Sequence, residues 1–494
     1  MQITNEWTEL ASKLNYRNQL FINGKFIDSL SGKSFDAISP IDQRKLTSIS
    51  AAQSEDVDAA VRAAKTAFDS GVWRNLNPRD KKEIMLRWAD LVRQNYKEIA
   101  LLETLEVGKP IGDTSGYDAL AVARNIQWYA ETIDKTYDEI APAPKSALAM
   151  ITREPLGVIG AIVPWNYPIV IASWKFAPAI AMGNSVVLKP SEESSLATLR
   201  IAELAIEAGL PAGVFNVVTG YGAEAGKALA LHHDVAKIAF SGSPAVGRLM
   251  LQYAAESNMK QVSLELGGKS PQVVLNDVLD LDVAASTIAW GIFYNSGQTC
   301  NAGSRVIVQS EIKDALFERL NKFVQNFRWG NPLDPTTQMG PVVSLKQRDR
   351  INSYLDQVGA NGEKFVFGGK KPSGDDCNFE PTLIDSVKHD SKLAQEEIFG
   401  PVIVTEIAKD EDHALELANG TDYGLAASVW SGNISKAHNF ARKLRAGTVW
   451  VNTFDMSDVI TPFGGFKNSG SGRDKSLHAL DAYSALKTTW VDLN

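Results

Sequence analysis

Short apolar runs alternate with helical patterns along the middle third of the chain. Each run is bounded by Gly, Pro, Ser or Asn, as buried strands are, and the five runs cover Val158–Val163, Ser185–Lys189, Val214–Val218, Val235–Phe240 and Gln261–Leu266. Helical segments fill the gaps, and the clearest has apolar residues at helical spacing from Ala197 to Ala208, just before Gly209. This order predicts right-handed crossovers and a parallel, doubly wound α/β sheet.

A second alternation of the same kind begins at Pro271 and predicts a second α/β domain. We expect strands and helices in turn at Gln272–Leu275, Leu281–Phe293, Arg305–Val308 and Leu316–Phe327. Upstream of the first sheet, two amphipathic patterns predict helices at Val57–Phe68 and Lys81–Leu105 that pack on that sheet.

The last residues, Ala485–Leu493, are apolar and rich in Thr, which is typical of an edge strand. An uncovered edge invites pairing with another subunit. The alternative is a terminal strand that is tucked into its own chain.

Length and charge narrow the class of protein. A chain of 494 residues exceeds the size at which a single core stops growing, so at least two domains are expected. Lys and Arg total 50 against 58 Asp and Glu, and a net charge of -8 offers no basic field for a phosphate backbone. A nucleic-acid partner is therefore not expected.

The number of cysteines and the apolar segments indicate in which cellular compartment the protein is expected. The two cysteines, Cys300 and Cys377, cannot form a disulfide framework and suit a reducing, cytoplasmic compartment. The first ten residues carry Glu6 and Glu9 and lack the charged start and apolar run of a secretory signal. The apolar segment 156–182 contains three prolines, an Asn and a Lys, so we interpret it as buried strand, loop and helix and expect no membrane contact.

Cys300 is a candidate nucleophile. It lies in Gly297-Gln298-Thr299-Cys300-Asn301-Ala302-Gly303, after a predicted helix and before a predicted strand. On such a tight loop the sulfur can face a cavity, and backbone N–H groups can lower the thiol pKa. The alternative is a small, inert, buried hydrophobic residue. Cys377 lies in a polar segment, and we assign it no role.

Glu265 is a candidate general base. It ends an apolar strand in Leu264-Glu265-Leu266-Gly267-Gly268-Lys269, and ligands of such sheets bind outside the carboxyl ends of the strands. Burial there would raise the carboxyl pKa. The alternative is a Glu that pairs with Lys269 or caps the next turn.

Other strand ends carry polar or glycine-rich loops. Asn166, in Pro164-Trp165-Asn166-Tyr167-Pro168, is held between prolines and can donate to an oxyanion, although Asn is also common in turns. Two glycine loops, at 220–226 and 241–247, stand between a strand and a helix. The second places Gly and Ser at a helix start, a good anion site, but either loop could be an ordinary turn.

Lys189-Pro190-Ser191-Glu192 ends the second predicted strand, where an acidic side chain could hold ribose hydroxyls. His232 and His233 are adjacent and face opposite ways, and the six histidines show no metal-ligand spacing, so metal catalysis is not expected.

Together these segments resemble the aldehyde dehydrogenase superfamily, over almost the whole chain. Besides the Asn166, Glu192, Glu265 and Cys300 segments quoted above, the motifs are Phe240-Ser241-Gly242-Ser243, Glu396-Glu397-Ile398-Phe399-Gly400-Pro401 and Pro462-Phe463-Gly464-Gly465. Within the superfamily the chain is most similar to bacterial gamma-glutamyl-gamma-aminobutyraldehyde and guanidinobutyraldehyde dehydrogenases, through segments 102–106, 128–131 and 472–480.

The resemblance implies roles for individual residues. Cys300 would be the nucleophile, Glu265 the general base, and Asn166 with the Cys300 backbone N–H the oxyanion hole. The cofactor would be NAD, and the residues expected to bind it are Trp165, Lys189, Glu192, Gly222, Gly242, Ser243, Gly247, Leu266, Glu397 and Phe399.

The implied reaction is oxidation of an aldehyde to a carboxylic acid. Cys300 thiolate attacks the carbonyl, hydride passes to NAD, and water activated by Glu265 hydrolyses the thioester. Alternatives are a broad-specificity or semialdehyde dehydrogenase, including the coenzyme A-acylating type that Glu265 disfavours, and a non-catalytic NAD-binding structural protein.

The resemblance also implies a domain division and an oligomer. The NAD-binding domain would comprise residues 1–135 and 156–266, the catalytic domain 267–470, and the oligomerisation strands 136–155 and 482–494 of a homodimer or homotetramer. Two departures stand out: Asp474 replaces a frequent Glu at a position linked to proton relay, and Pro244 replaces a frequent Thr in the second glycine loop.

We expect a substrate with a cationic or polar amino-type group several carbons from the aldehyde, as in polyamine catabolism. By resemblance, four acids, Glu106, Asp118, Asp455 and Asp458, line the substrate tunnel, and Tyr167, Trp174 and Phe463 form its aromatic wall. The alternative is that these acids are solvated surface charge, or that Asp455 only caps a loop.

Overall fold

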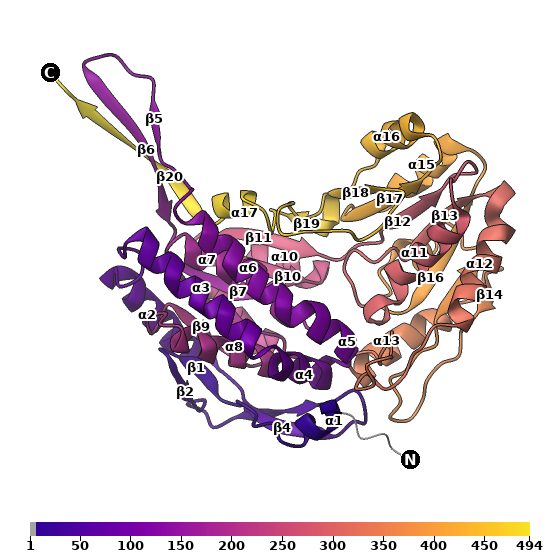
Figure 1. The fold of residues 1–494 in the computed structure, drawn as a ribbon, viewed down its shortest axis with the longest axis horizontal. Helices are drawn as coiled ribbons and strands as arrows, with labels where there is room; N and C mark the ends of the chain where they lie inside the picture. Colours follow the sequence, from indigo (N-terminus) through magenta and orange to yellow (C-terminus); the bar gives the residue numbers. More distant parts are fainter. Residues whose placement is uncertain (1–5) are drawn as a thin grey trace.

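The computed structural model describes residues 6–494 and contains two large sheets, each covered by helices on both faces (Figure 1). A narrow arm of strands projects from the first sheet and carries the C-terminal strand (Figure 1). A separate two-stranded sheet joins β3 (Ser34–Ile38) and β4 (Lys45–Ser50).

The first sheet is doubly wound. Its order is β19 (Gly470–Ser471), β11 (Gln261–Leu266), β10 (Val235–Gly242), β7 (Val158–Ile162), β8 (Ser185–Lys189), β9 (Phe215–Val217), β1 (Leu20–Ile22) and β2 (Lys25–Ile27). The pairs from β11 to β9 are parallel, while β19, β1 and β2 pair antiparallel. The five predicted strands are therefore confirmed, and the order reverses between β7 and β10, where such sheets form a ligand crevice.

Two apolar cores cover the faces of this sheet. The larger lies under α3 (Pro78–Gln94), α4 (Tyr96–Val107), α6 (Ala119–Thr132), α7 (Pro168–Ala181) and α8 (Leu196–Glu207). The other lies under α2 (Ser54–Ser70), α9 (Lys227–Leu231) and α10 (Pro244–Glu256). Both cores contain fully buried residues, so the strands are apolar on both faces, as doubly wound sheets require.

The single helix predicted at 81–105 is wrong, because α3 and α4 are separate helices that meet at Asn95. The Asn95 Nδ2 donates to the carbonyl of Leu91 at 2.8 Å, and its Oδ1 accepts from Arg200 at 3.0 Å. The side chain thus competes with the helical backbone and ends the first helix.

The second sheet has the order β14 (Lys364–Phe367), β15 (Thr382–Asp385), β16 (Val402–Ala408), β13 (Arg305–Gln309), β12 (Pro271–Val274), β17 (Ala426–Trp430) and β18 (Thr448–Val451). On one face pack α11 (Leu281–Phe293) and α12 (Lys313–Gln325), and on the other α15 (Glu411–Asn419) and α16 (Ile434–Lys443). This confirms the second α/β alternation.

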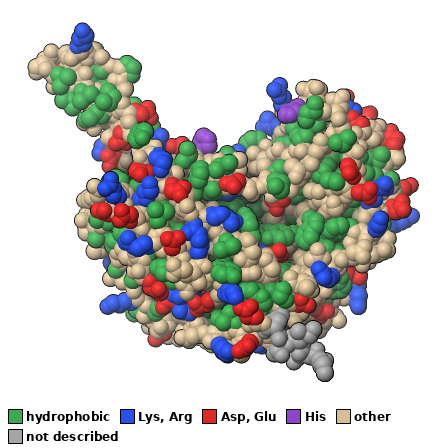
Figure 2. Space-filling model, viewed as in Figure 1, with side chains coloured by type: hydrophobic (Ala, Val, Ile, Leu, Met, Phe, Trp, Pro, Cys, Tyr) green, Lys and Arg blue, Asp and Glu red, His purple; other side chains and the backbone are tan. Residues whose placement is uncertain are grey.

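The arm contains β5 (Glu139–Ala141), β6 (Ala147–Pro155) and β20 (Ser484–Asp492), with β6 in the middle. All nine residues of β20 pair with β6, so the C-terminal strand is covered on one edge by its own chain. Within residues 6–494 nothing pairs with its other edge. Hydrophobic side chains gather on the arm (Figure 2).

The helices of residues 6–494 include none with the length and apolar character needed to cross a membrane.

Candidate active site

Three strand ends of the first sheet meet the Cys300 loop at one pocket. The loop after β7 supplies Trp165 and Asn166, the end of β10 supplies Gly242 and Ser243, and β11 supplies Glu265. Carboxyl ends of parallel strands share an edge of the sheet, which is why these segments converge. The pocket encloses about 750 Å³, part of it open to solvent, and Cys300 lies in its wall.

A second pocket, of about 1220 Å³, meets the first at the nucleophile. Cys300, Ile171, Trp174 and Phe463 line both pockets. Cys300 therefore stands between a pocket at the strand ends, whose lining includes Asn166, Glu265 and Glu397, and a pocket rich in aromatic side chains. This arrangement suits a nucleophile that must meet two different ligands.

Asn166 is fixed beside the Cys300 loop. Its side chain is 3% exposed, its Nδ2 donates to the carbonyl of Gln298 at 2.9 Å, and its own carbonyl accepts from Asn295 Nδ2 at 2.9 Å. The structure thus brings together Cys300 and Asn166, which are far apart in sequence. An amide nitrogen held in this way has a second N–H that can donate to an oxyanion.

Burial raises the pKa of the Cys300 thiol well above its usual value, and the nearby Glu397 and Glu265 carboxylates add to the effect. The backbone N–H of Asn301 lowers this pKa but does not outweigh burial. The predicted lowering of the thiol pKa by a backbone N–H is therefore confirmed as a contribution, but desolvation is larger and the net shift is upward.

Glu265 is 7% exposed and lines the first pocket, and neither carboxylate oxygen has a hydrogen-bond partner within residues 6–494. Burial raises its pKa well above the usual value, with a further increase from Asp474, while Lys175 and Arg473 oppose this. A desolvated, unpartnered carboxylate of this kind fits a general base.

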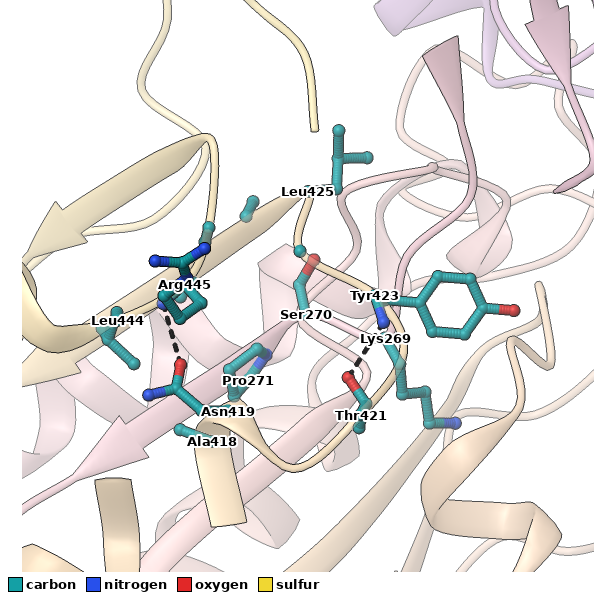
Figure 3. A pocket seen from close by; sticks show the side chains of 14 residues that line it. Lys269, Ser270, Pro271, Ala418, Asn419, Thr421, Tyr423, Leu425, Leu444 and Arg445 are labelled. Carbon is teal, nitrogen blue, oxygen red and sulfur yellow. Dashed lines mark hydrogen bonds between the residues drawn. The ribbon is translucent and has the colours of Figure 1, made fainter. Parts of the chain in front are cut away.

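The alternative that Glu265 pairs with Lys269 is not observed. Lys269 lies instead at the side of a small separate pocket of about 250 Å³, where its side chain extends past Thr421 and Tyr423 and away from Asn419 (Figure 3). No ion pair joins Lys269 to an acid in the described part of the chain, and burial lowers its pKa to about 7. None of the predicted site residues lines this pocket.

Most residues predicted to bind the cofactor line the first pocket: Trp165, Gly242, Ser243, Leu266, Glu397 and Phe399. The rings of Trp165 and Phe399 lie edge to face with centroids 5.3 Å apart. Glu397 Oε1 accepts from the Gly268 N–H at 3.1 Å, and a Cβ at Gly267 would lie 2.2 Å from the same carboxylate. Glycine is therefore required there if Glu397 is to reach the pocket.

Lys189, Glu192, Gly247 and Gly222 do not line that pocket. Lys189 Nζ pairs with Glu192 at 3.2 Å, and Glu192 lines a neighbouring pocket with Tyr221. A Cβ at Gly247 would lie 2.9 Å from Leu266, so this glycine allows close packing of α10. Gly222 starts a short helical turn and lines neither pocket.

The polar groups present fit a dinucleotide. The first turn of α10, with Ser243 as its N-cap, ends at this pocket, and free backbone N–H groups of a helix start could bind a phosphate. The Ser241 hydroxyl beside it is buried without a partner in the described residues, and Glu192 and Glu397 supply acceptors for hydroxyl groups. Gln347 and Arg350 also line the pocket, and no motif in the sequence identified them.

The second pocket contains the predicted aromatic wall of Tyr167, Trp174 and Phe463, together with Asp455. Further aromatic residues, Tyr117, Trp290, Tyr294 and Phe454, complete it. Asp455 accepts from Asn301 Nδ2 at 2.7 Å, and its desolvated surroundings raise its pKa.

Three of the four predicted tunnel acids lie elsewhere. Glu106 is 2% exposed and accepts backbone N–H groups at the start of α8, from Ser195 at 2.7 Å and Leu196 at 2.8 Å. Asp118 is buried and pairs with Lys109 at 2.5 Å. Asp458 is exposed and accepts from the Ile460 N–H at 3.1 Å. These acids cap a helix, neutralise a lysine and shape a loop.

Two lysines near the site were not predicted. Lys109 lies behind the pocket wall with its Nζ 3.5 Å from the centroid of the Tyr167 ring, and Tyr167 in turn bonds to the Thr299 hydroxyl at 2.8 Å. Lys475 lines the second pocket itself. It lies in the segment 472–480 that carries the subfamily resemblance, which was the available signal.

Residues 26–489 match the aldehyde dehydrogenase family. The chain belongs to this family, and the predicted fold and enzyme class, an NAD-dependent aldehyde dehydrogenase, are confirmed.

Among its relatives, the chain is 46% identical over 488 residues to an aminoacetaldehyde dehydrogenase of Pseudomonas aeruginosa, covering 99% of this chain and 98% of that protein. It is also 46% identical over 487 residues to the NADP/NAD-dependent aldehyde dehydrogenase PuuC of Escherichia coli, with the same coverage. Both relatives confirm the predicted similarity to bacterial dehydrogenases of amino-type aldehydes.

Solved structures are equally similar. A gamma-glutamyl-gamma-aminobutyraldehyde dehydrogenase from Burkholderia cenocepacia superimposes with a TM-score of 0.96 at 52% identity over 99% of both chains. An indole-3-acetaldehyde dehydrogenase in complex with NAD+ superimposes with a TM-score of 0.97 at 48% identity, again over 99% of both chains.

Proposed function

We propose that this enzyme oxidises an aldehyde that bears an amino-type group, either an omega-amino or a gamma-glutamylamino aldehyde, with NAD and through a covalent Cys300 thioester. The observation that carries the proposal is the position of Cys300 between two pockets, one of which also holds Asn166 and Glu265. The names of an aminoacetaldehyde dehydrogenase and a gamma-glutamyl-gamma-aminobutyraldehyde dehydrogenase among its relatives support the substrate class.

The first step is attack by the Cys300 sulfur on the aldehyde carbon. The thiol must first lose its proton. Two carboxylates line the same pocket, Glu265 and Glu397, and we assign the proton to Glu265 because both of its oxygens lack a hydrogen-bond partner within residues 6–494, whereas Glu397 accepts from the Gly268 N–H. The carbonyl oxygen becomes an oxyanion, which accepts hydrogen bonds from Asn166 Nδ2 and the Cys300 backbone N–H. NAD, when bound, accepts the hydride that leaves the carbon of the thiohemiacetal.

The second step releases the acid. Glu265 removes a proton from water as its oxygen attacks the thioester carbonyl, and the C–S bond breaks with the electron pair returning to sulfur. Asp474 forms a buried ion pair with Lys175 at 2.5 Å, and both residues act on the Glu265 pKa, Asp474 raising it and Lys175 lowering it. We propose this pair as the path by which the proton leaves Glu265.

The test compares the wild type with Cys300→Ala, using pentanal and NAD. We expect loss of NADH formation by at least about a thousandfold in the variant, because the covalent step is removed. NAD should still bind in a fluorescence titration, since the residues expected to hold the cofactor are unchanged in the variant. Unchanged turnover would falsify the covalent mechanism.

We also propose the domain roles that the resemblance implied. Residues 1–135 and 156–266 would bind NAD, 267–470 would supply the nucleophile, and 136–155 with 482–494 would hold subunits together in a homodimer or homotetramer. The free edge of β20 and the apolar side chains of the arm support the oligomer. Two free cysteines support a cytoplasmic location.

A further inference from the structure

Lys475 is a buried cation in the aromatic pocket without a bonding partner. The residue is 4% exposed and lines the same pocket as Cys300. Within residues 6–494 its ammonium group makes no hydrogen bond and has no carboxylate within ion-pair distance. The carboxylates of Asp455, Asp458 and Asp474 lie near enough to act on its charge but do not bond to it. An ammonium has three N–H donors, so those of Lys475 are free to bind a ligand that enters the pocket.

Backbone strain holds Lys475 in this position. Lys475 has φ 63° and the next residue, Ser476, has φ 54°, both in the left-handed region that side chains other than glycine rarely adopt. Contacts on both sides enforce this conformation. Asp474 exchanges two backbone hydrogen bonds of 2.8 Å with Phe463, and the Ser476 N–H donates to the Val459 carbonyl at 2.6 Å. Strain that is enforced in this way at a pocket points to a functional side chain.

Contacts with aromatic rings do not satisfy the N–H donors of the Lys475 ammonium. Its Nζ lies 5.4 Å from the Trp174 ring centroid and 5.7 Å from that of Phe463, near the outer limit of cation–π attraction. Such contacts hold the side chain against the wall and leave its N–H donors free for a ligand. Asp455 is the acid that lines the pocket, and its carboxylate already accepts from Asn301.

We propose that Lys475 is a specificity residue whose ammonium binds a carboxylate at the far end of the aldehyde. The inference rests on the proposed function and deepens it. Of the two substrate types proposed there, it selects the gamma-glutamylamino aldehyde, which carries an amino-acid end, over a purely cationic omega-amino aldehyde. The amino-acid end has both a carboxylate and an ammonium, and the pocket offers Lys475 and Asp455 for them.

The test uses two aldehydes that differ in one charge: 4-(gamma-glutamylamino)butanal and its analogue with the carboxylate converted to a carboxamide. The measured quantity is the ratio of kcat/KM for the two compounds within each enzyme, so that a general loss of activity cancels. We expect the wild type to favour the carboxylate by about tenfold or more, because a charge-assisted hydrogen bond is lost with the amide.

In Lys475→Gln the ratio should fall to about one, whereas Lys475→Arg should retain most of it because its charge remains. Lys260→Gln is a matched control, since Lys260 is also a buried lysine but lies outside the pocket. It should keep the wild-type ratio.

A wild-type ratio near one would overturn the proposal, even if Lys475→Gln could not be purified. A ratio that persists in Lys475→Gln would overturn it as well and assign Lys475 to packing alone. Turnover of 4-aminobutanal by the wild type separates these results from a failure of the proposed function, which predicts oxidation of this omega-amino aldehyde regardless of Lys475.

Discussion

Two groups at the centre of the site, the Cys300 thiol and the Glu265 carboxyl, are both protonated more strongly than usual because burial disfavours their charged forms. Each must lose its proton to act, the thiol as a nucleophile and the carboxyl as a base. The sign of the pH dependence follows from this, because the active forms of both groups become more populated as the pH rises.

We therefore expect kcat/KM for pentanal to increase from about pH 6 to about pH 9, without a falling limb in that range. The measurement is initial NADH formation in buffers of constant ionic strength. A rate that declines as pH rises over this range would contradict the assignment of these two groups.

Substitution of the base should separate the two chemical steps. In Glu265→Gln the thioester should form but hydrolyse slowly, so rapid mixing should show a burst of about one NADH per active site followed by slow turnover. Glu396→Gln is a suitable control, because this acid bonds to the Tyr354 hydroxyl and lines neither pocket at Cys300. Full steady-state turnover without a burst would remove Glu265 from the role of base.

Cofactor preference depends on another carboxylate. Glu192 is held near Lys189 and accessible from the neighbouring pocket, where it can accept from ribose hydroxyls but would repel a 2′-phosphate. We expect kcat/KM to favour NAD over NADP in the wild type and the preference to weaken by about tenfold in Glu192→Ser. Equal use of the two cofactors by the wild type would refute this role of Glu192.

At the residue scale, catalytic residues at strand ends could be predicted from the sequence, but contacts between side chains and distant parts of the chain could not. Cys300, Glu265 and Asn166 could be predicted because each sits in a motif at a strand end or on a tight loop. Glu106 and Asp118 could not be placed, because their partners, the start of α8 and Lys109, are recognisable only after folding. The direction of Lys475 depends on a left-handed backbone that no local pattern revealed.

At the scale of elements, the apolar strands were predictable because both faces of each sheet are buried, and short apolar runs then stand out. Helix boundaries were less predictable, as the break between α3 and α4 at Asn95 shows. The start of α8 illustrates the reason. The side chain of its N-cap residue, Ser195, accepts no hydrogen bond from the first turn, and the carboxylate of Glu106 from α4 is the acceptor instead. A cap supplied by a distant residue leaves no signature beside the helix.

Loss of this cap should lower the stability of the protein without changing its affinity for the substrate. Glu106→Ala leaves buried N–H groups of α8 without acceptors, and we expect a loss of about 3 kcal/mol, visible as a lower thermal unfolding midpoint. KM for pentanal should stay within about twofold of wild type, since Glu106 is outside the pocket. Glu207→Ala, at the far end of the same helix, is the control and should shift the midpoint little, because its ion pair is half exposed.

At the scale of the whole molecule, the arm is the feature that a lone subunit does not explain. Leu486 is 64% exposed and Trp490 is 60% exposed, and both lie on β20, whose outer edge has no partner in residues 6–494. Strand residues two or four apart share a face, so these two side chains form one apolar surface. Such a surface, beside an open strand edge, is suited to contact with a second copy of the chain.

We expect light scattering after size-exclusion chromatography to give a mass of two or four times the 53.7 kDa of one chain. The double variant Leu486→Lys, Trp490→Lys should shift toward smaller assemblies, because two charges would have to be buried at the contact. Met259→Lys adds a charge at another exposed apolar residue, 86% exposed and outside the arm, and should leave the mass unchanged. Should the double variant keep the wild-type mass while Met259→Lys loses it, the contact would lie on the first sheet's outer surface and the role assigned to the arm would be wrong.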